Sequence, residues 1–151
     1  MKKNLKSILF HTLVPVMLAF TIQMLIGDYK PYLESLKKPL DIPNIVFIIV
    51  WSVLYIMIGL SASFVDQENK PREMKIYYIQ LIINLLYPVV FFYGKMIAIG
   101  ALMTIAILGL SIYLLIRFYK INKLSFYLFI PYVLWLIFAN YLQIGIYFMN
   151  K

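Results

Sequence analysis

The stretch IVFIIVWSVLYIMIGLSASFV, residues 45–65, contains no Asp, Glu, Lys or Arg. An α-helix rises about 1.5 Å per residue, so this stretch is long enough to cross a hydrocarbon core about 30 Å thick. Backbone N–H and C=O groups in lipid need partners within the protein, and a helix supplies them within the segment. The stretch therefore predicts a membrane-spanning helix.

Four more stretches of the same kind lie on either side of it, at residues 7–26, 76–92, 96–116 and 124–149. The chain has 151 residues, of which 64% are hydrophobic and 13% charged, whereas about a quarter of the residues of a soluble domain are charged. The connections at residues 66–75, 93–95 and 117–123 are short, so successive helices run antiparallel. We predict an all-α integral membrane protein in which residues 1–151 form a single five-helix transmembrane domain.

The longest connection is the first loop, residues 27–43. Its prolines are Pro31, Pro39 and Pro43, and its leucines, at helical spacing, are Leu33, Leu36 and Leu40. This pattern predicts a short amphipathic helix lying over one end of the bundle. Long loops are often functional, so we favour a lid role over that of a passive connector.

The basic residues flank the spans and set the predicted orientation. Nine lie at the N-terminus and in the second and fourth loops: Lys2, Lys3, Lys6, Lys70, Arg72, Lys75, Arg117, Lys120 and Lys123. Five lie on the other side: Lys30, Lys37, Lys38, Lys95 and Lys151. The bias predicts a multi-pass protein of the cell membrane with a cytoplasmic N-terminus. The net charge of +8 is explained by this flanking role, and no nucleic-acid partner is predicted.

The sequence lacks the combinations of residues from which conventional catalytic and metal-binding sites are built. The chain has no cysteine and a single histidine, His11. All six acids are expected in loops: Asp28, Glu34, Asp41, Asp66, Glu68 and Glu73. We predict no metal site, and whether the chain is an enzyme stays open. His11 is either a haem or metal ligand or a residue near the interface that hydrogen-bonds a neighbouring helix, and we favour the second interpretation.

Aromatic and amide side chains recur at helical spacing on three spans. On the second span they are Phe47, Trp51 and Tyr55, and on the third Gln80, Asn84 and Pro88, with Tyr87 and Phe91 alongside. On the fifth they are Trp135, Phe138, Ala139 and Leu142, with Asn140 and Gln143 nearby. Pro88 also deprives the carbonyl of Asn84 of its helical donor. Amides within a membrane face the bundle interior. They are either hydrogen-bonded links between helices or the polar corner of an aromatic cavity for a large flat ligand.

Three segments resemble the translocator protein family, also called the peripheral-type benzodiazepine receptor or tryptophan-rich sensory protein family, and point to a bacterial member. They are VFIIVWSVLYIMIG at residues 46–59, QLIINLLYPVVFF at residues 80–92 and PYVLWLIFANYLQ at residues 131–143. Lys38-Pro39 and Pro43 in the first loop also match. Together with their spacing these segments cover roughly residues 10–150.

The resemblance implies a five-helix bundle with a ligand pocket under the first loop. It implies binding of tetrapyrroles such as protoporphyrin IX and haem, and of benzodiazepine-type compounds, with no cofactor required. By position, the binding residues are Tyr32, Pro43, Phe47, Trp51, Asn84, Trp135, Phe138, Ala139 and Leu142, to which the aromatic pattern adds Tyr55 and Tyr87. The resemblance makes Trp51 and Trp135 the candidates for photo-oxidation.

Some family features are missing. Residues 41–44 read Asp-Ile-Pro-Asn where the family usually has Trp-x-Pro-Pro, and Leu85 and Tyr87 stand where two tryptophans are common. Photochemistry is then either weaker than in other members of the family or rests on Trp51.

Our first hypothesis is a membrane tetrapyrrole-binding protein that promotes photo-oxidative degradation of protoporphyrin IX. One alternative is a transporter or carrier of tetrapyrroles, although five spans cannot form two equal repeats. The other is a ligand-sensing interaction protein that forms a homodimer through small residues of the fourth span. Those residues are Ala98, Gly100, Ala101 and Gly109.

Overall fold

The computed structural model describes residues 4–151, and within them five helices are long and apolar enough to cross a membrane. They are α1 (Leu5–Ile26), α3 (Asn44–Asp66), α4 (Pro71–Pro88), α5 (Ile97–Ile121) and α6 (Lys123–Met149). α4 continues directly into a π-helical segment, η1 (Val89–Tyr93). The first loop holds one short helix, α2 (Lys30–Ser35). The prediction of an all-α membrane protein with five spanning helices is confirmed.

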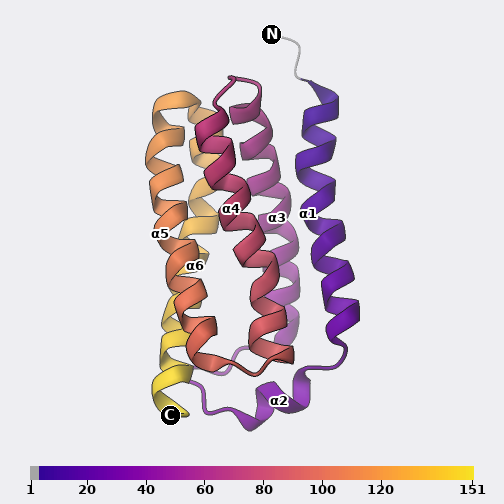
Figure 1. Ribbon diagram of the computed structural model, residues 1–151, viewed down its shortest axis with the longest axis vertical. Coiled ribbons are helices and arrows are strands. Elements are labelled where there is room, and N and C mark those ends of the chain that lie inside the picture. The colour runs from indigo at the N-terminus through magenta and orange to yellow at the C-terminus, as the bar shows by residue number, and fades with distance from the viewer. Residues whose placement is uncertain (1–3) are drawn as a thin grey trace.

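The five long helices stand side by side and alternate in direction (Figure 1). α1 packs against α3 and α4, α3 packs against α6, and α5 lies between α6 and α4. The helices thus form a closed ring in the order α1, α3, α6, α5, α4. One end of the bundle carries the start of α1 and is called the N-terminal end. The other carries α2 and the C-terminus and is called the lid end.

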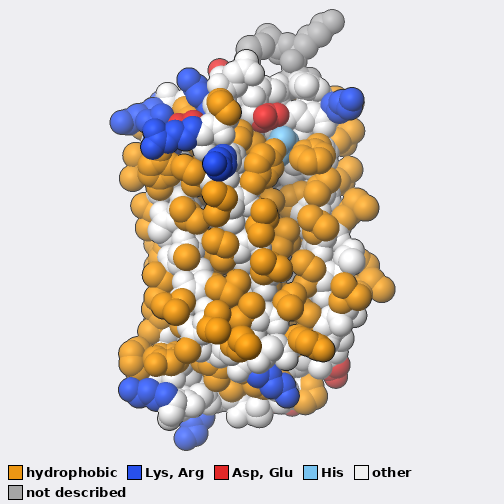
Figure 2. Space-filling model, viewed as in Figure 1, with side chains coloured by type: hydrophobic (Ala, Val, Ile, Leu, Met, Phe, Trp, Pro, Cys, Tyr) orange, Lys and Arg blue, Asp and Glu red, His pale blue; other side chains and the backbone are white. Residues whose placement is uncertain are grey.

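Charged side chains gather at the two ends of the molecule, and hydrophobic side chains cover the surface between them (Figure 2). This distribution suits a protein whose middle is surrounded by acyl chains. The basic residues counted in the loops lie at both ends, and Lys2 and Lys3 fall outside the described residues. The cytoplasmic placement of the N-terminus stays a prediction.

The helices extend past the apolar stretches, and the expectation that all six acids lie in loops is wrong. Glu34 lies in α2, Asp66 is the last residue of α3, and Glu73 lies in the first turn of α4. The Glu73 side chain is only 4% exposed, and its carboxylate accepts hydrogen bonds from Nε and Nη2 of Arg117 at 2.9 and 2.7 Å. A helix does not end where its hydrophobicity ends. The ion pair with Arg117, whose two N–H groups both donate to Oε1 of Glu73, makes the burial of this carboxylate tolerable.

The expected disturbance at Pro88 takes the form of the π-helical segment. Proline cannot donate to the preceding turn, and the backbone widens after it. The N–H of Gly94 donates to the carbonyl of Val89 at 2.8 Å, and that of Met96 donates to Val90 at 3.1 Å. This widened turn carries Phe91 and Phe92 towards the lid end.

The backbones of α1 and α3 are in close contact at Gly59. A Cβ atom at this position would lie 2.2 Å from the carbonyl oxygen of His11 and 2.8 Å from the Cα of Thr12. Only a residue without a side chain allows the backbone of α1 to rest on α3 in this way. Gly59 therefore fixes the position of α1 in the ring.

We expect Gly59→Ala to destabilise the bundle by about 1–3 kcal/mol, because the added methyl group must push α1 away from α3. The thermal or SDS-induced unfolding midpoint of the purified protein in mild detergent measures the effect. Gly109→Ala is the matched control, since a Cβ there meets no atom of the described residues within 4 Å. Equal behaviour of the two variants would contradict the close contact.

Candidate ligand-binding site

The aromatic residues of α3 and α6 face each other in the lid half of the bundle. The rings of Phe47 and Trp135 meet edge to face with their centroids 5.8 Å apart. One turn deeper, the Trp51 ring lies 6.3 Å from that of Tyr132, also edge to face. The stripe predicted on the second span therefore meets the stripe predicted on the fifth, and two indoles belong to one aromatic wall.

A polar network joins three helices at the inner end of this wall. The Tyr55 hydroxyl donates to Oδ1 of Asn84 at 2.9 Å, and Nδ2 of Asn84 donates to the Tyr132 hydroxyl at 2.7 Å. Tyr132 in turn donates to Oε1 of Gln80 at 2.6 Å. All four side chains are buried. The α4 amides thus link helices, as the simpler of the two interpretations predicts.

A second set of polar contacts ties α6 to α4 and α5 nearer the lid end. The Tyr87 hydroxyl donates to Oε1 of Gln143, and Nε2 of Gln143 donates to the carbonyl of Ile97 at 3.2 Å. The Nδ2 of Asn140 donates to the carbonyl of Thr104 at 3.0 Å. These bonds hold α6 in register with its neighbours, so the aromatic wall is rigidly supported.

The first loop covers the lid end with a helix shorter than the leucine spacing predicts. α2 ends at Ser35, and Leu36 has an extended backbone. Pro39 keeps Leu40 out of the helix, because the ring of a helical proline would clash with the carbonyl four residues earlier. From α2, the Tyr32 ring meets that of Phe91 edge to face at 5.9 Å, and Nζ of Lys95 lies 5.4 Å from the Tyr32 ring centroid.

Three contacts outside α2 fasten the loop to the helices. The Tyr29 hydroxyl donates to Oδ1 of Asn44 at 2.6 Å. Asn150 makes two hydrogen bonds to the backbone of Lys37, accepting at 3.0 Å and donating at 2.7 Å. The Pro39 ring rests on Gly145, where a Cβ would come within 2.5 Å of it. The loop is thereby fixed at both ends, to α3 and to α6.

Two hydrogen-bond donors in this region are buried without a protein partner in residues 4–151. They are the indole Nε1–H of Trp135 and the hydroxyl of Tyr32, and the Nε2 of Gln80, in the polar network described above, is a further unpaired donor. Burial raises the pKa of Tyr32 above its ordinary value, so this hydroxyl stays protonated. Buried donors are rarely left unpaired, and each such group calls for an explanation. Acceptor groups of a bound molecule would provide one.

The sequence matches the TspO/MBR family over residues 11–149. The chain belongs to this family. It is 31% identical to protein CrtK of Rhodobacter capsulatus over 124 residues, 78% of this chain and 77% of that protein. It is 32% identical to the tryptophan-rich protein TspO of Chlorobaculum tepidum over 126 residues, with 79% of each chain covered.

An uncharacterized membrane protein of Bacillus subtilis, YtaB, is 32% identical over 126 residues, 80% of this chain and 81% of that protein. These matches confirm the resemblance and the assignment to a multi-pass membrane protein family.

This TspO/MBR protein brings most of the residues predicted for its site into three groups. Tyr55 and Asn84 join through the polar network, and Trp51 lies beside Tyr55 at 5.5 Å between ring centroids. Phe47, Trp135 and Phe138 form the second group, with Trp135 and Phe138 5.3 Å apart. Tyr32 and Tyr87 form the third, since both rings contact Phe91.

The remaining three predicted residues belong to none of these groups. Pro43 is exposed at the start of α3, Ala139 is half-buried and Leu142 is buried in α6. Asn150 and Gly145 are neighbours that the sequence did not indicate, whereas Phe91 and Gln143 belong to the predicted aromatic and amide pattern. The resemblance included Gln143 in a matching segment, but nothing in the sequence pairs it with Tyr87.

The interpretation of His11 as a hydrogen-bonded residue near one end is confirmed. Its Nδ1 lies 2.8 Å from the carbonyl of Ser7, which only accepts, so Nδ1 carries the proton. Nε2 then accepts from the Tyr78 hydroxyl of α4 at 2.6 Å. Within residues 4–151, His, Asp and Glu side chains form no group of three that would hold a metal ion.

We expect Asn84→Leu to destabilise the protein by about 1–3 kcal/mol, because the buried Tyr55 hydroxyl loses its acceptor. Adding Tyr55→Phe removes the stranded hydroxyl and should recover part of that loss. Unfolding midpoints of both single variants and the double variant, in mild detergent, form the test. Strictly additive effects would contradict the coupling of these two side chains.

Proposed function

We propose that this TspO/MBR protein binds tetrapyrroles in the membrane and promotes photo-oxidative degradation of protoporphyrin IX, with benzodiazepine-type compounds as further ligands of the same site. The observation that carries the proposal is the pairing of the α3 and α6 aromatic stripes, which brings Trp51 and Trp135 into one wall beneath the lid. The same chemistry would serve other planar hydrophobic molecules.

The residues present fit a large flat ligand with polar groups at its edge. Indole and phenyl faces offer stacking surface in an apolar environment. The Nε1–H of Trp135 and the Tyr32 hydroxyl, unpaired within the described residues, offer donors to carboxylate or carbonyl oxygens. The ammonium group of Lys95 lies 5.4 Å from the ring centroid of Tyr32. This positive charge favours a ligand with an anionic edge. Protoporphyrin IX and haem combine these features, since each has a planar macrocycle and two carboxylate side chains.

The chain's role in degradation would be to bind, orient and shield the ligand. When bound, the porphyrin itself absorbs light and generates reactive oxygen species. Trp51 would supply an oxidisable indole: it is half-buried and lies against Tyr55 and Tyr132. The Asn84 network fixes those two tyrosines and thereby the orientation of the Trp51 ring. The α2 lid, fastened to α3 and α6, would limit the access of water.

We expect Trp51→Phe to retain protoporphyrin IX binding in the dark and to slow its light-dependent loss, because phenylalanine keeps an apolar ring but is much harder to oxidise. Porphyrin fluorescence under illumination in air measures the rate, and a dark titration measures binding. Trp135→Phe serves as the comparison for the second indole. Unchanged photodegradation in both variants would remove the indoles from the mechanism.

We expect Tyr32→Phe to weaken protoporphyrin IX binding about fivefold while leaving the unfolding midpoint unchanged, because the hydroxyl has no partner within the described chain and one hydrogen bond contributes about 1 kcal/mol. A dark titration in detergent provides the measurement. Tyr93→Phe is the control, since Tyr93 is 72% exposed. Wild-type affinity in the Tyr32 variant would show that its hydroxyl does not contact the ligand.

A further inference from the structure

Basic side chains concentrate at one corner of the N-terminal end, which we call the basic corner. It consists of the start of α4 and the turn between α5 and α6, with Arg72, Lys75, Arg117, Lys120 and Lys123. Figure 2 shows basic side chains gathered at this end over α4 and α5, with hydrophobic side chains beneath them. Arg117 is half-buried, and the other four are exposed. Residues 71–75 and 117–123 contain one acid, Glu73, so the corner has an excess of positive charge.

The opposite side of the same end has a different charge balance. α1 contributes Lys6 there, and α3 ends at Asp66, whose Oδ2 accepts a hydrogen bond from Ser7 at 2.9 Å. A second acid, Glu68, follows in the next connection. Membrane orientation depends on the number of basic residues on one side of the bilayer, and it does not require them to share a corner. A cluster of basic residues next to spanning helices is what an anionic lipid headgroup recognises.

Within the corner, a buried carboxylate holds Arg117 in place. Its Nε and Nη2 donate to Oε1 of Glu73 at 2.9 and 2.7 Å, and the Glu73 side chain is 4% exposed. A guanidinium group has five N–H donors. The other three have no partner in the part of the chain that the structure describes, and the Arg117 side chain is 39% exposed. The pair therefore presents the free edge of a fixed guanidinium at the membrane surface, and such an edge binds phosphate oxygens.

Below the corner, apolar side chains line the seam between α4 and α5. Helical spacing places them in two rows, one running from Arg72 along α4 and the other from Arg117 along α5. The rows are Ile76, Ile79 and Ile83 on α4, and Tyr113, Leu110 and Ala106 on α5. All six side chains are half-buried or exposed. An anion bound at the corner is thus placed directly above a surface that acyl chains contact.

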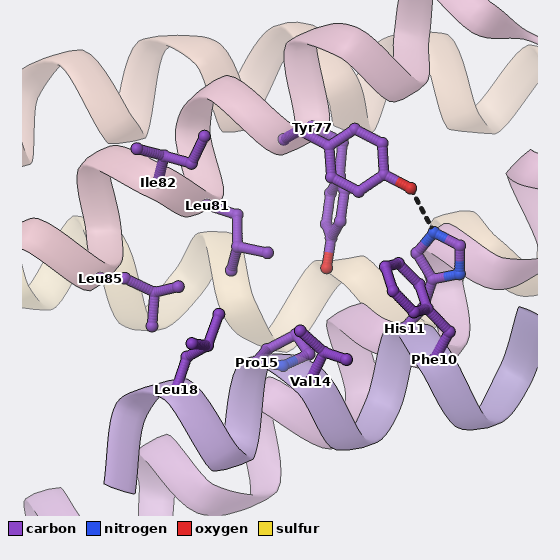
Figure 3. A pocket seen from close by; sticks show the side chains of 10 residues that line it. Phe10, His11, Val14, Pro15, Leu18, Tyr77, Leu81, Ile82 and Leu85 are labelled. Carbon is purple, nitrogen blue, oxygen red and sulfur yellow. Dashed lines mark hydrogen bonds between the residues drawn. The ribbon is translucent and has the colours of Figure 1, made fainter. Parts of the chain in front are cut away.

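The other side of α4 lacks this combination. There α4 meets α1 in an apolar groove, and Figure 3 shows the side chains that line it. None of the described residues in its lining is Lys or Arg. Its polar contact, from the Tyr78 hydroxyl to Nε2 of His11 at 2.6 Å, is already made. This groove therefore offers no charge that would select one lipid headgroup over another.

We propose that the basic corner and the α4–α5 seam form a binding site for an anionic phospholipid of the surrounding bilayer. The headgroup phosphate accepts hydrogen bonds from the free edge of the Arg117 guanidinium. Positive charge is added by Arg72, which precedes Glu73 on α4, and by Lys120, one turn beyond Arg117 on α5. The acyl chains lie along the seam. The site is separate from the α3–α6 wall and does not depend on the proposed function.

Two features of the site set its selectivity. The excess positive charge disfavours a cationic choline group, so the site distinguishes phosphatidylglycerol from phosphatidylcholine. The apolar rows give a lipid contacts that a free phosphate ion cannot make.

The experiment offers the purified full-length protein equal amounts of phosphatidylglycerol and phosphatidylcholine with the same acyl chains, in mixed micelles at low salt. Lipids retained after washing are quantified by mass spectrometry. The wild type should retain phosphatidylglycerol about tenfold over phosphatidylcholine, and Arg72→Gln or Lys120→Gln should each lower this ratio about fivefold, the effect of one basic residue near a membrane surface. Both side chains are exposed, so neither change threatens the fold.

Two further variants separate a discrete site from general attraction. Lys6→Gln is the matched control, because it makes the same change of charge at the same end of the bundle but on α1. It should leave the ratio unchanged. Arg117→Lys keeps a positive charge beside Glu73 but loses the fork of N–H groups, so it should lower the ratio about fivefold, as expected for a lost hydrogen bond to a charged group.

Inorganic phosphate in excess over the lipid should not displace phosphatidylglycerol. The proposal is overturned if the wild type shows no preference for phosphatidylglycerol, or if Lys6→Gln lowers the ratio as much as Lys120→Gln, because the attraction would then be spread over the whole end. Displacement by inorganic phosphate would also overturn it, since the corner would then be a site for a free anion.

Discussion

The hydrogen bonds of Asn84 are the interaction on which the interior depends. Lipid offers no partner to a polar side chain, so an amide in the middle of a span must find one on another helix. Asn84 accepts from Tyr55 of α3 and donates to Tyr132 of α6. A single side chain of α4 therefore sets the spacing and register of three helices, and both tyrosines that contact Trp51 are held by it.

The two halves of the bundle differ in the buried groups that they contain. Towards the N-terminal end, Phe118 and Phe129 are fully buried and pack edge to face, and Ser61 and Ser125 exchange hydrogen bonds between their hydroxyls and backbone carbonyls. Towards the lid end, Trp135 and Tyr32 keep donors that no group of the described chain accepts. The first half contains this packed core and one unpaired hydroxyl, that of Tyr77, whereas the unpaired donors of the second half lie beside the aromatic residues of the proposed site.

Local sequence predicted the elements better than their connections. Length and apolarity alone predict that a run such as residues 45–65 forms a spanning helix, so the five spans could be predicted. The inward direction of Asn84 could also be predicted, because an amide within the membrane needs a partner on another helix. The leucine spacing did not predict that α2 ends at Ser35, since Pro39 keeps Leu40 out of the helix. The contacts of Asn150 with Lys37 and of Gly145 with Pro39 join residues more than a hundred positions apart, and no local pattern carries that information. The burial of Glu73 likewise depends on Arg117, a residue of another helix.

The central claim is that a planar ligand lies against both indoles of the α3–α6 wall. The chain has only two tryptophans, so ¹⁵N-labelled protein in detergent gives two indole N–H resonances, which Trp51→Phe and Trp135→Phe assign. Titration with protoporphyrin IX in the dark should shift both along one saturation curve, with the Trp135 N–H moving as it gains an acceptor and Trp51 responding to the ring current of the macrocycle. Two resonances that stay in place at saturating porphyrin would contradict the account.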